Sequence, residues 1–220
     1  MGVHIDPQLN FKKHISVLST KLSKALFFLR STKSFLNKRA LKFIYYATFH
    51  ANLIYAIQIY SCTNKSNLLP LVKKQKAAVR IVNNSKYNDN SEPIFKSLRI
   101  LPLPLLCDFF KLQFMQRFLQ GFLPQSFNNT WTTNRIRHDN QPEIELRNDD
   151  DLFIPFARTN LISNQPLVSF PKLWETFTAG EIKFLHNKLE FNEKLKEYFL
   201  NTLNSTIVCS RLFCPACTNR

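Results

Sequence analysis

The chain has 220 residues, a formal net charge of +15 and 45% hydrophobic residues, including 21 phenylalanines. This hydrophobic content excludes the class of chains that stay disordered because they cannot bury enough apolar surface, and the length allows one domain or two. Only three residues are glycine, which argues against glycine-rich phosphate loops and dense β-hairpins and favours helices.

The excess positive charge lies entirely in the first half of the sequence. Residues 1–125 hold 19 Lys and Arg against 4 Asp and Glu, whereas residues 126–220 hold 11 of each kind. A basic half that also folds around an apolar core must carry its cations on the surface, where they repel one another unless a polyanion lies among them. Nucleic acid is the expected partner. The alternative is a solvated basic surface that only keeps the protein soluble.

The first predicted elements are a short extended segment and a basic helix. Val3 and Ile5 form an extended pattern that ends at the turn-forming pair Asp6–Pro7, and a strand here would need partners later in the chain or in sequence that precedes it. Asn10 is expected to cap a helix that ends between residues 30 and 34. Its apolar face comprises Ile15, Leu18, Leu22, Ala25 and Leu29. Its basic residues, mostly off that face, are Lys12, Lys13, Lys21 and Lys24.

Two further helices are predicted before residue 90. Asn37 can cap an aromatic-rich helix that continues to the polar residues 63–65. Its stretch 43–60 is the most apolar of the chain, but the polar residues within it favour a buried helix over a membrane span. Ser66 is expected to open the next helix, with Pro70 in its first turn, where the missing N–H costs little.

This third helix carries the sharpest charge pattern. Lys73, Lys76 and Arg80 recur at positions i, i+3 and i+7, so three cations share one stripe, while the valines 72, 79 and 82 point elsewhere. Like charges at this spacing destabilise an isolated helix by a few tenths of a kcal/mol per pair, an arrangement that bound phosphates would explain. Solvation alone is the competing explanation.

The remaining sequence predicts a mainly α protein: a helical bundle with a short N-terminal extended segment and an irregular C-terminal half that carries one long helix. Ser91 is expected to cap a short helix with Glu92 and Pro93 in its first turn. Residues 105–119 are expected to form a helix that is apolar almost all round and stops at Gly121 and Pro124. The expected domains are a basic helical domain over residues 1–125, an irregular linker over 126–171, a helical segment over 172–204 with its helix from Ala179 to Asn204, and a cysteine-containing tail over 205–220.

No catalytic residue, metal or cofactor is predicted for this chain. Common nucleotide-binding, hydrolase and zinc-protease motifs are missing, and the four acids of the basic half are too scattered to hold two metal ions. The histidines 4, 14 and 50 are interpreted as packing or surface residues. The run Asp149–Asp151 is interpreted as a solvated acidic loop rather than a metal site.

The cysteines leave one alternative open. Cys214 and Cys217 have C-x-x-C spacing and Cys209 adds a third thiol, so the tail either binds zinc or carries thiols on a frayed terminus. The odd total of five cysteines, with no leader sequence before them, predicts a reducing compartment, nuclear or cytoplasmic, rather than secretion.

Five successive segments carry a family resemblance: MGVHIDPQLNFKKHI, KLSKALFFLR, FLNKRALKFIYYATFHANLIYAIQIY, NLLPLVKKQKAAVRIVNN and EPIFKSLRILPL. In this order and spacing they resemble the region that follows the catalytic palm in reverse transcriptases of non-LTR retrotransposons, the jockey-like LINE elements. The resemblance covers Gly2 to about Pro124. It extends more loosely to FPKLWE and to the helix through residues 194–198.

The resemblance implies a thumb-like helical bundle, with its connection, that grips the backbones of template and primer. The metal-binding aspartates of the palm would precede Met1, so the chain is expected to be a remnant or a mis-bounded gene model without polymerase activity of its own. Its expected partners are an RNA/DNA duplex or other nucleic acid, and a palm domain in the parent protein.

The expected phosphate contacts are Lys12, Lys13, Lys21, Lys24, Lys73, Lys76 and Arg80, which would position nucleic acid without reading its sequence. Tyr45, Tyr46 and Phe49 could stack on bases, but their helical spacing favours core packing. Two rivals remain. One is a protein–protein interaction or self-associating helical module without nucleic-acid affinity, and the other is a complete enzyme of unknown type.

Overall fold

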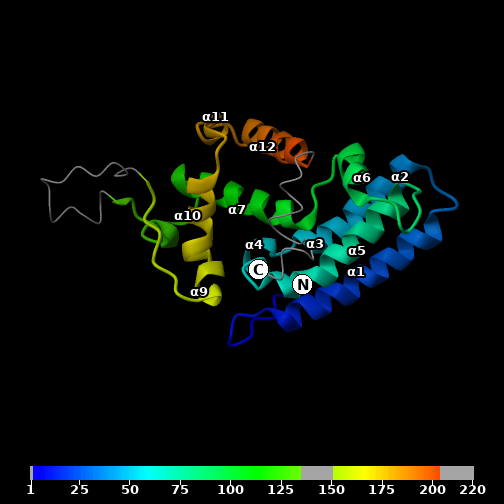
Figure 1. The fold of residues 1–220 in the computed structure, drawn as a ribbon, viewed down its shortest axis with the longest axis horizontal. Helices are drawn as coiled ribbons and strands as arrows, with labels where there is room; N and C mark the ends of the chain where they lie inside the picture. The colour runs from blue at the N-terminus through cyan, green and yellow to red at the C-terminus, as the bar shows by residue number, and fades with distance from the viewer. Residues whose placement is uncertain (1, 135–150, 204–220) are drawn as a thin grey trace, which may run out of the picture. The chain divides into compact units, whose positions relative to one another are not determined.

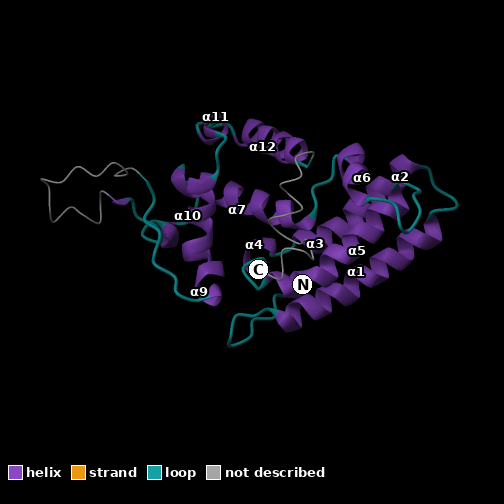
Figure 2. Cartoon of the chain, in the orientation of Figure 1, coloured by secondary structure: helices purple, strands orange, loops and turns teal. Residues whose placement is uncertain are grey.

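The computed structural model describes residues 2–134 and 151–203, and these are mainly helical (Figure 1, Figure 2). The described ranges contain no strand beyond one isolated antiparallel bridge between Thr133 and Leu152. The predicted mainly α class is therefore confirmed. The described residues fall into two compact units: unit 1 comprises residues up to Cys107 and from Lys196 onward, and unit 2 comprises Asp108–Leu195. Within the same ranges, each helix is too short or too polar to span a bilayer.

Unit 1 is built around two long helices, α1 (Lys12–Thr32) and α5 (Lys65–Val82), which are each other's main packing partners (Figure 1). The two helices run in the same direction. At one end the Thr63 hydroxyl donates to the Asn10 carbonyl at 2.6 Å, and at the other the Lys38 amine donates to the Asn83 side chain at 2.6 Å. All five residues of the apolar face predicted for α1 are buried.

The start of α1 differs from the prediction. Asn10 does not cap the helix; the N-cap residue is Phe11, with a φ of 53° and no side-chain cap. The backbone N–H of Phe11 donates to the Asp6 carboxylate at 2.9 Å. The turn at Asp6–Pro7 is present, with the Leu9 N–H donating to the Asp6 carbonyl at 2.9 Å. The Asp6 carboxylate, and not the Asn10 side chain, therefore makes the side-chain hydrogen bond at the start of α1.

The aromatic segment after α1 begins as predicted and then breaks. The Asn37 side chain caps α2 (Lys38–Ile44) by accepting from the Ala40 N–H at 2.9 Å. The helix widens into a π-helix, η1 (Tyr45–His50), and continues as α3 (Ala51–Ile54). Ala56 then adopts left-handed backbone, φ 55°, before α4 (Ile57–Tyr60). The single helix expected up to residues 63–65 is thus four shorter pieces.

The next helix, α5, starts one residue earlier than predicted. Asn64 is its N-cap residue and Lys65 its first residue. Pro70 consequently lies in the second turn, where it has no N–H to offer the Ser66 carbonyl. Lys65 is thus one more cation within this helix.

A buried amide ties α5 to the chain that follows α6 (Ser91–Leu98). The Gln75 side chain is fully buried; its Nε2 donates to the Leu101 carbonyl at 3.0 Å and its Oε1 accepts from the Leu103 N–H at 2.6 Å. The same Nε2 lies 3.3 Å from the Tyr45 hydroxyl. Because the polar atoms of Gln75 are satisfied, this side chain stabilises the core instead of weakening it.

Unit 2 surrounds an aromatic cluster on α7 (Leu103–Leu119). The Phe114 ring meets the rings of Phe127, Trp131 and Phe170 edge to face, with centroids 5.6–6.1 Å apart. The helix ends at Leu119, and Gly121, the predicted stop, follows with a φ of 71° that suits glycine.

The segment interpreted as an irregular linker over residues 126–171 contains some regular structure. The structure places here the end of the 3-10 helix η2 (Gln125–Phe127), α9 (Asn160–Asn164) and the start of α10 (Pro166–Thr176). The long helix expected over 179–204 is two helices, α11 (Gly180–Lys183) and α12 (Lys188–Thr202). Cys209, Cys214 and Cys217 lie outside the described residues, as do Asp149 and Asp150.

Candidate nucleic-acid interface

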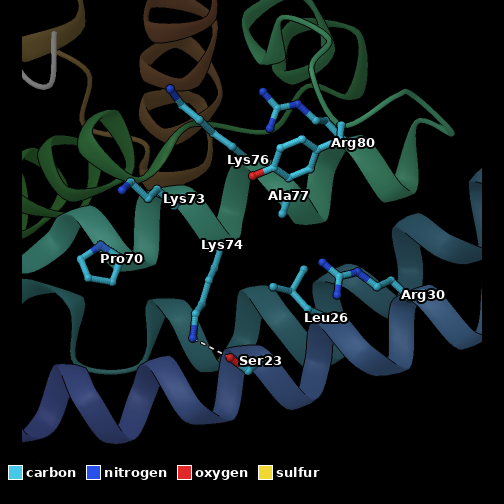
Figure 3. Close-up of a pocket in the computed structure, with 10 residues that line it drawn as sticks. Ser23, Leu26, Arg30, Pro70, Lys73, Lys74, Lys76, Ala77 and Arg80 are labelled. Atoms are coloured by element: carbon cyan, nitrogen blue, oxygen red, sulfur yellow. Dashed lines mark hydrogen bonds between the residues drawn. The ribbon is translucent and has the colours of Figure 1, made fainter. Parts of the chain in front are cut away.

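A groove of about 690 Å³ opens on the surface of α1 and α5 in unit 1 (Figure 3). Five of its ten lining residues are cationic, and the lining contains no aspartate or glutamate. The cations are Arg30, Lys73, Lys74, Lys76 and Arg80. We call this feature the basic groove. The cationic stripe predicted on α5 therefore lies on a concave surface together with two further cations.

The α5 stripe separates cleanly from the core side of the helix. Lys73 and Lys76 are exposed and Arg80 is half-buried, while the valines 72, 79 and 82 are buried. The Arg80 Nε donates to the Asp89 carbonyl at 2.9 Å, so this guanidinium also holds the loop that follows α5. The stripe thus combines two solvent-facing amines with a cation whose position is fixed.

Lys74 plays a different part from its neighbours. Its amine donates to the Ser19 carbonyl at 2.6 Å, the Ser19 hydroxyl at 2.7 Å and the Ser23 hydroxyl at 2.5 Å. In Figure 3 the Lys74 side chain runs from α5 to Ser23 on α1, whereas Lys73 and Lys76 extend away from α1. Partial burial lowers the pKa of Lys74. This lysine fastens the two helices that form the basic groove.

No carboxylate neutralises the basic groove within residues 2–134 and 151–203. The ion pairs of Arg99 with Glu197 and of Lys194 with Glu190 lie elsewhere, since none of these four residues lines the groove. Asp89, the acidic residue nearest to the α5 stripe in sequence, uses its carboxylate to accept from the Lys86 N–H at 2.7 Å. Among the described residues, the positive charge of the groove is therefore not balanced by an ion pair.

The structure distributes the four lysines predicted on α1 differently. Lys12 lies on the same helical stripe as Ser23 and Arg30, about 16 Å before Ser23 along the helix, so it extends the basic face toward the start of α1. Lys13 and Lys24 are exposed on another stripe. Lys21 is half-buried beside a separate small pocket that contains His14 and Tyr55. None of the four lines the basic groove.

The aromatic residues considered for base stacking belong to the core. Tyr45 and Phe49 are fully buried and stack on each other with ring centroids 5.4 Å apart. Burial raises the pKa of Tyr45 far above the ordinary range of a phenol. Tyr46 is half-buried against His50. The interpretation that these rings pack internally is confirmed for Tyr45 and Phe49.

Sequence reasoning missed Arg30, Lys74 and Tyr87, which also line the basic groove. Arg30 could have been found by matching the polar stripe of α1 to that of α5, but this requires knowing that the two helices pack side by side. Tyr87 carries no periodic signal because it lies in the loop after α5.

In the part of the chain that the structure describes, no three His, Cys, Asp or Glu side chains gather as metal ligands would. The chain matches no protein-family model, and no curated protein or solved structure matches it significantly.

Proposed function

We propose that unit 1 binds nucleic acid through its phosphates, with the basic groove as the contact surface. One observation carries the proposal: five cations from two helices line one open groove that no described carboxylate neutralises. Lys73, Lys76 and Arg80 are the central phosphate contacts. Lys12 and Arg30 extend the contact along α1.

Like charges at neighbouring helical positions destabilise the folded chain, and the α5 stripe adds to the repulsion of a chain with net charge +15. A polyphosphate backbone offers closely spaced negative charges and releases condensed counterions when cations replace them. A groove of this kind therefore gains more from a linear polyanion than from scattered small anions.

We further propose that this unit is the thumb-like, template–primer-contacting region of a non-LTR retrotransposon reverse transcriptase, without polymerase activity of its own. The support is the ordered run of sequence segments that resemble that region, which includes both helices of the basic groove. A helical unit with a cationic surface agrees with the same role. A palm domain and an RNA/DNA duplex are the partners that this role requires.

The test is the salt dependence of binding to a blunt RNA/DNA duplex. Affinity is expected to fall steeply with salt concentration, and the variant Lys73→Gln, Lys76→Gln, Arg80→Gln should make the slope of log K against log salt less negative by about 2 to 3. Fluorescence anisotropy over a salt series measures both slopes. A slope that the triple variant leaves unchanged would reject the groove as the contact surface.

Two further variants make the experiment specific. Because Arg80 also holds the following loop, the double variant Lys73→Gln, Lys76→Gln separates loss of charge from movement of that loop. A matched control removes three exposed lysines outside the basic groove, Lys96, Lys172 and Lys188. This control loses the same net charge and should keep most of the original slope, since long-range charge is screened at moderate salt.

Exposed phenylalanine side chains support a second candidate function. Phe27, Phe35 and Phe43 are 73%, 85% and 65% exposed on α1, the following loop and α2. Exposed aromatic rings of this size favour a protein–protein or self-associating module. Light scattering separates the two candidates: tight self-association without duplex affinity, abolished by Phe27→Ser and Phe35→Ser, would favour the second.

A further inference from the structure

The basic groove contains one aromatic residue whose ring is almost fully exposed. Tyr87 lines the groove together with Lys76 and Arg80, and 82% of its surface is open to solvent. Of the aromatic rings considered for base contact, those of Tyr45 and Phe49 are buried in the core and that of Tyr46 is half-buried. Tyr87 is therefore the one aromatic side chain of the groove lining that can contact a ligand face on.

The loop that carries Tyr87 is held by hydrogen bonds on both sides of the ring. Tyr87 occupies a central position of a turn in which the Asp89 N–H donates to the Lys86 carbonyl at 3.3 Å and the Lys86 N–H donates to the Asp89 carboxylate at 2.7 Å. Arg80 anchors this turn to α5 through the Asp89 carbonyl, and the Ser85 N–H donates to the Arg80 carbonyl at 2.9 Å. The backbone is fixed while the side chain is exposed, which lowers the entropy cost of using the ring in binding.

We propose that Tyr87 is a stacking platform for an unpaired base next to the duplex bound in the basic groove. This inference rests on the proposed nucleic-acid binding and names the ligand more closely: a duplex with a single-stranded extension. The neighbouring cations hold the phosphates, and the tyrosine ring holds one base.

The requirement for an unpaired base follows from geometry. Bases inside a duplex hide their faces in the stack, so an aromatic side chain can cover a base face only where the strand is single or ends. Stacking tolerates any base, because every base has a π face. The predicted preference is therefore for the structure of the nucleic acid and not for its sequence.

The test compares two probes on the full chain: a blunt RNA/DNA duplex and the same duplex with a few unpaired nucleotides, one of them 2-aminopurine. The original protein should bind the extended probe more tightly and quench the 2-aminopurine fluorescence. Tyr87→Ala should lose about 5-fold or more in affinity for the extended probe and abolish the quenching, and it should lose less affinity for the blunt duplex than for the extended probe. Tyr87→Phe keeps the ring and should behave like the original protein.

Several outcomes would overturn the inference without affecting the proposed function. Equal affinities for the two probes, or an unchanged preference in Tyr87→Ala, would do so while salt-dependent duplex binding persists. Tyr87→Phe failing as badly as Tyr87→Ala would assign the effect to the hydroxyl group and not to stacking. If the original protein binds neither probe, the proposed function itself fails, and that result is recognised before any Tyr87 variant is examined. Circular dichroism of each variant confirms that its helices are intact.

Discussion

Adjacent lysines on α5 point in different directions and make different contacts. Lys73 lines the basic groove and extends away from α1 (Figure 3), whereas Lys74 turns toward α1 and donates its amine to three acceptors on Ser19 and Ser23. Successive side chains on a helix differ by about 100° in direction, so one lysine can face solvent while the next one faces the neighbouring helix. The charge of Lys74 therefore serves the packing of α1 on α5.

We predict that Lys74→Met destabilises the protein by about 1 to 2 kcal/mol, because two serine hydroxyls and one carbonyl lose their donor at a helix contact. Lys73→Met is the matched control and should change the free energy of unfolding by less than about 0.5 kcal/mol, since Lys73 is exposed. Urea unfolding measures both. Equal effects of the two substitutions would contradict the structural role given to Lys74.

At the scale of elements, the sequence predicts packing faces better than helix breaks. The apolar face of α1, the Asn37 cap and the Gly121 stop all follow from periodicity and capping chemistry, and all three are present. The break at Ala56 could not be predicted, because left-handed backbone at an alanine has no local sequence signal and must be imposed by tertiary packing. The same holds for the π-helix η1, which lies inside an uninterrupted apolar pattern.

The candidate site was predictable to a similar degree. The spacing of Lys73, Lys76 and Arg80 identified one wall of the basic groove from sequence alone. Arg30 and Tyr87 could not be added, because one depends on which stripe of α1 faces α5 and the other on the path of a loop. Local periodicity assigns residues to a face of a helix, but only packing decides which faces meet.

The π-helix η1 gives the protein a pH-dependent stability. His50, its last residue, is largely buried against the Tyr46 ring with centroids 5.0 Å apart, and its Nδ1 is among the buried polar atoms without a hydrogen-bond partner. Burial, followed by the positive charge of Lys196, lowers the pKa of His50 to about 4. The folded state therefore holds this imidazole neutral over a range of pH in which the unfolded chain protonates it.

The sign of the effect follows from this difference. Between the ordinary histidine pKa of 6.5 and the folded value of about 4, the unfolded state binds more protons, so stability is lost as the pH falls through this window, by about 3 kcal/mol in all. His50→Gln should have a flatter profile of unfolding free energy between pH 7 and pH 4. A parallel loss in both proteins would show that other groups cause the decline. The pKa of His14 is also lowered by burial, so some slope should remain in the variant.

At the scale of the whole molecule, the net charge of +15 predicts that salt has opposite effects on folding and on binding. Self-repulsion destabilises the folded chain, and salt screens it, because the Debye length falls from about 30 Å at 0.01 M to about 8 Å at 0.15 M. The same screening weakens binding to phosphates. Low salt is therefore the condition in which the protein alone is least stable and the complex is tightest.

We accordingly expect the melting temperature of the protein alone to rise by a few degrees between low and physiological salt, since about 1 kcal/mol shifts it by about 2 to 4 °C in a chain of this length. The groove variant Lys73→Gln, Lys76→Gln, Arg80→Gln should melt at a higher temperature at low salt, and its melting temperature should respond less to salt, than the variant that lacks Lys96, Lys172 and Lys188. The reason is that the three charges removed from the groove are crowded on one surface. Differential scanning calorimetry with matched buffers measures both. Added duplex should raise the melting temperature of the original protein at low salt and not at high salt. If both triple variants respond to salt alike, the repulsion is spread over the whole surface, and the concentration of charge in the basic groove has no energetic consequence.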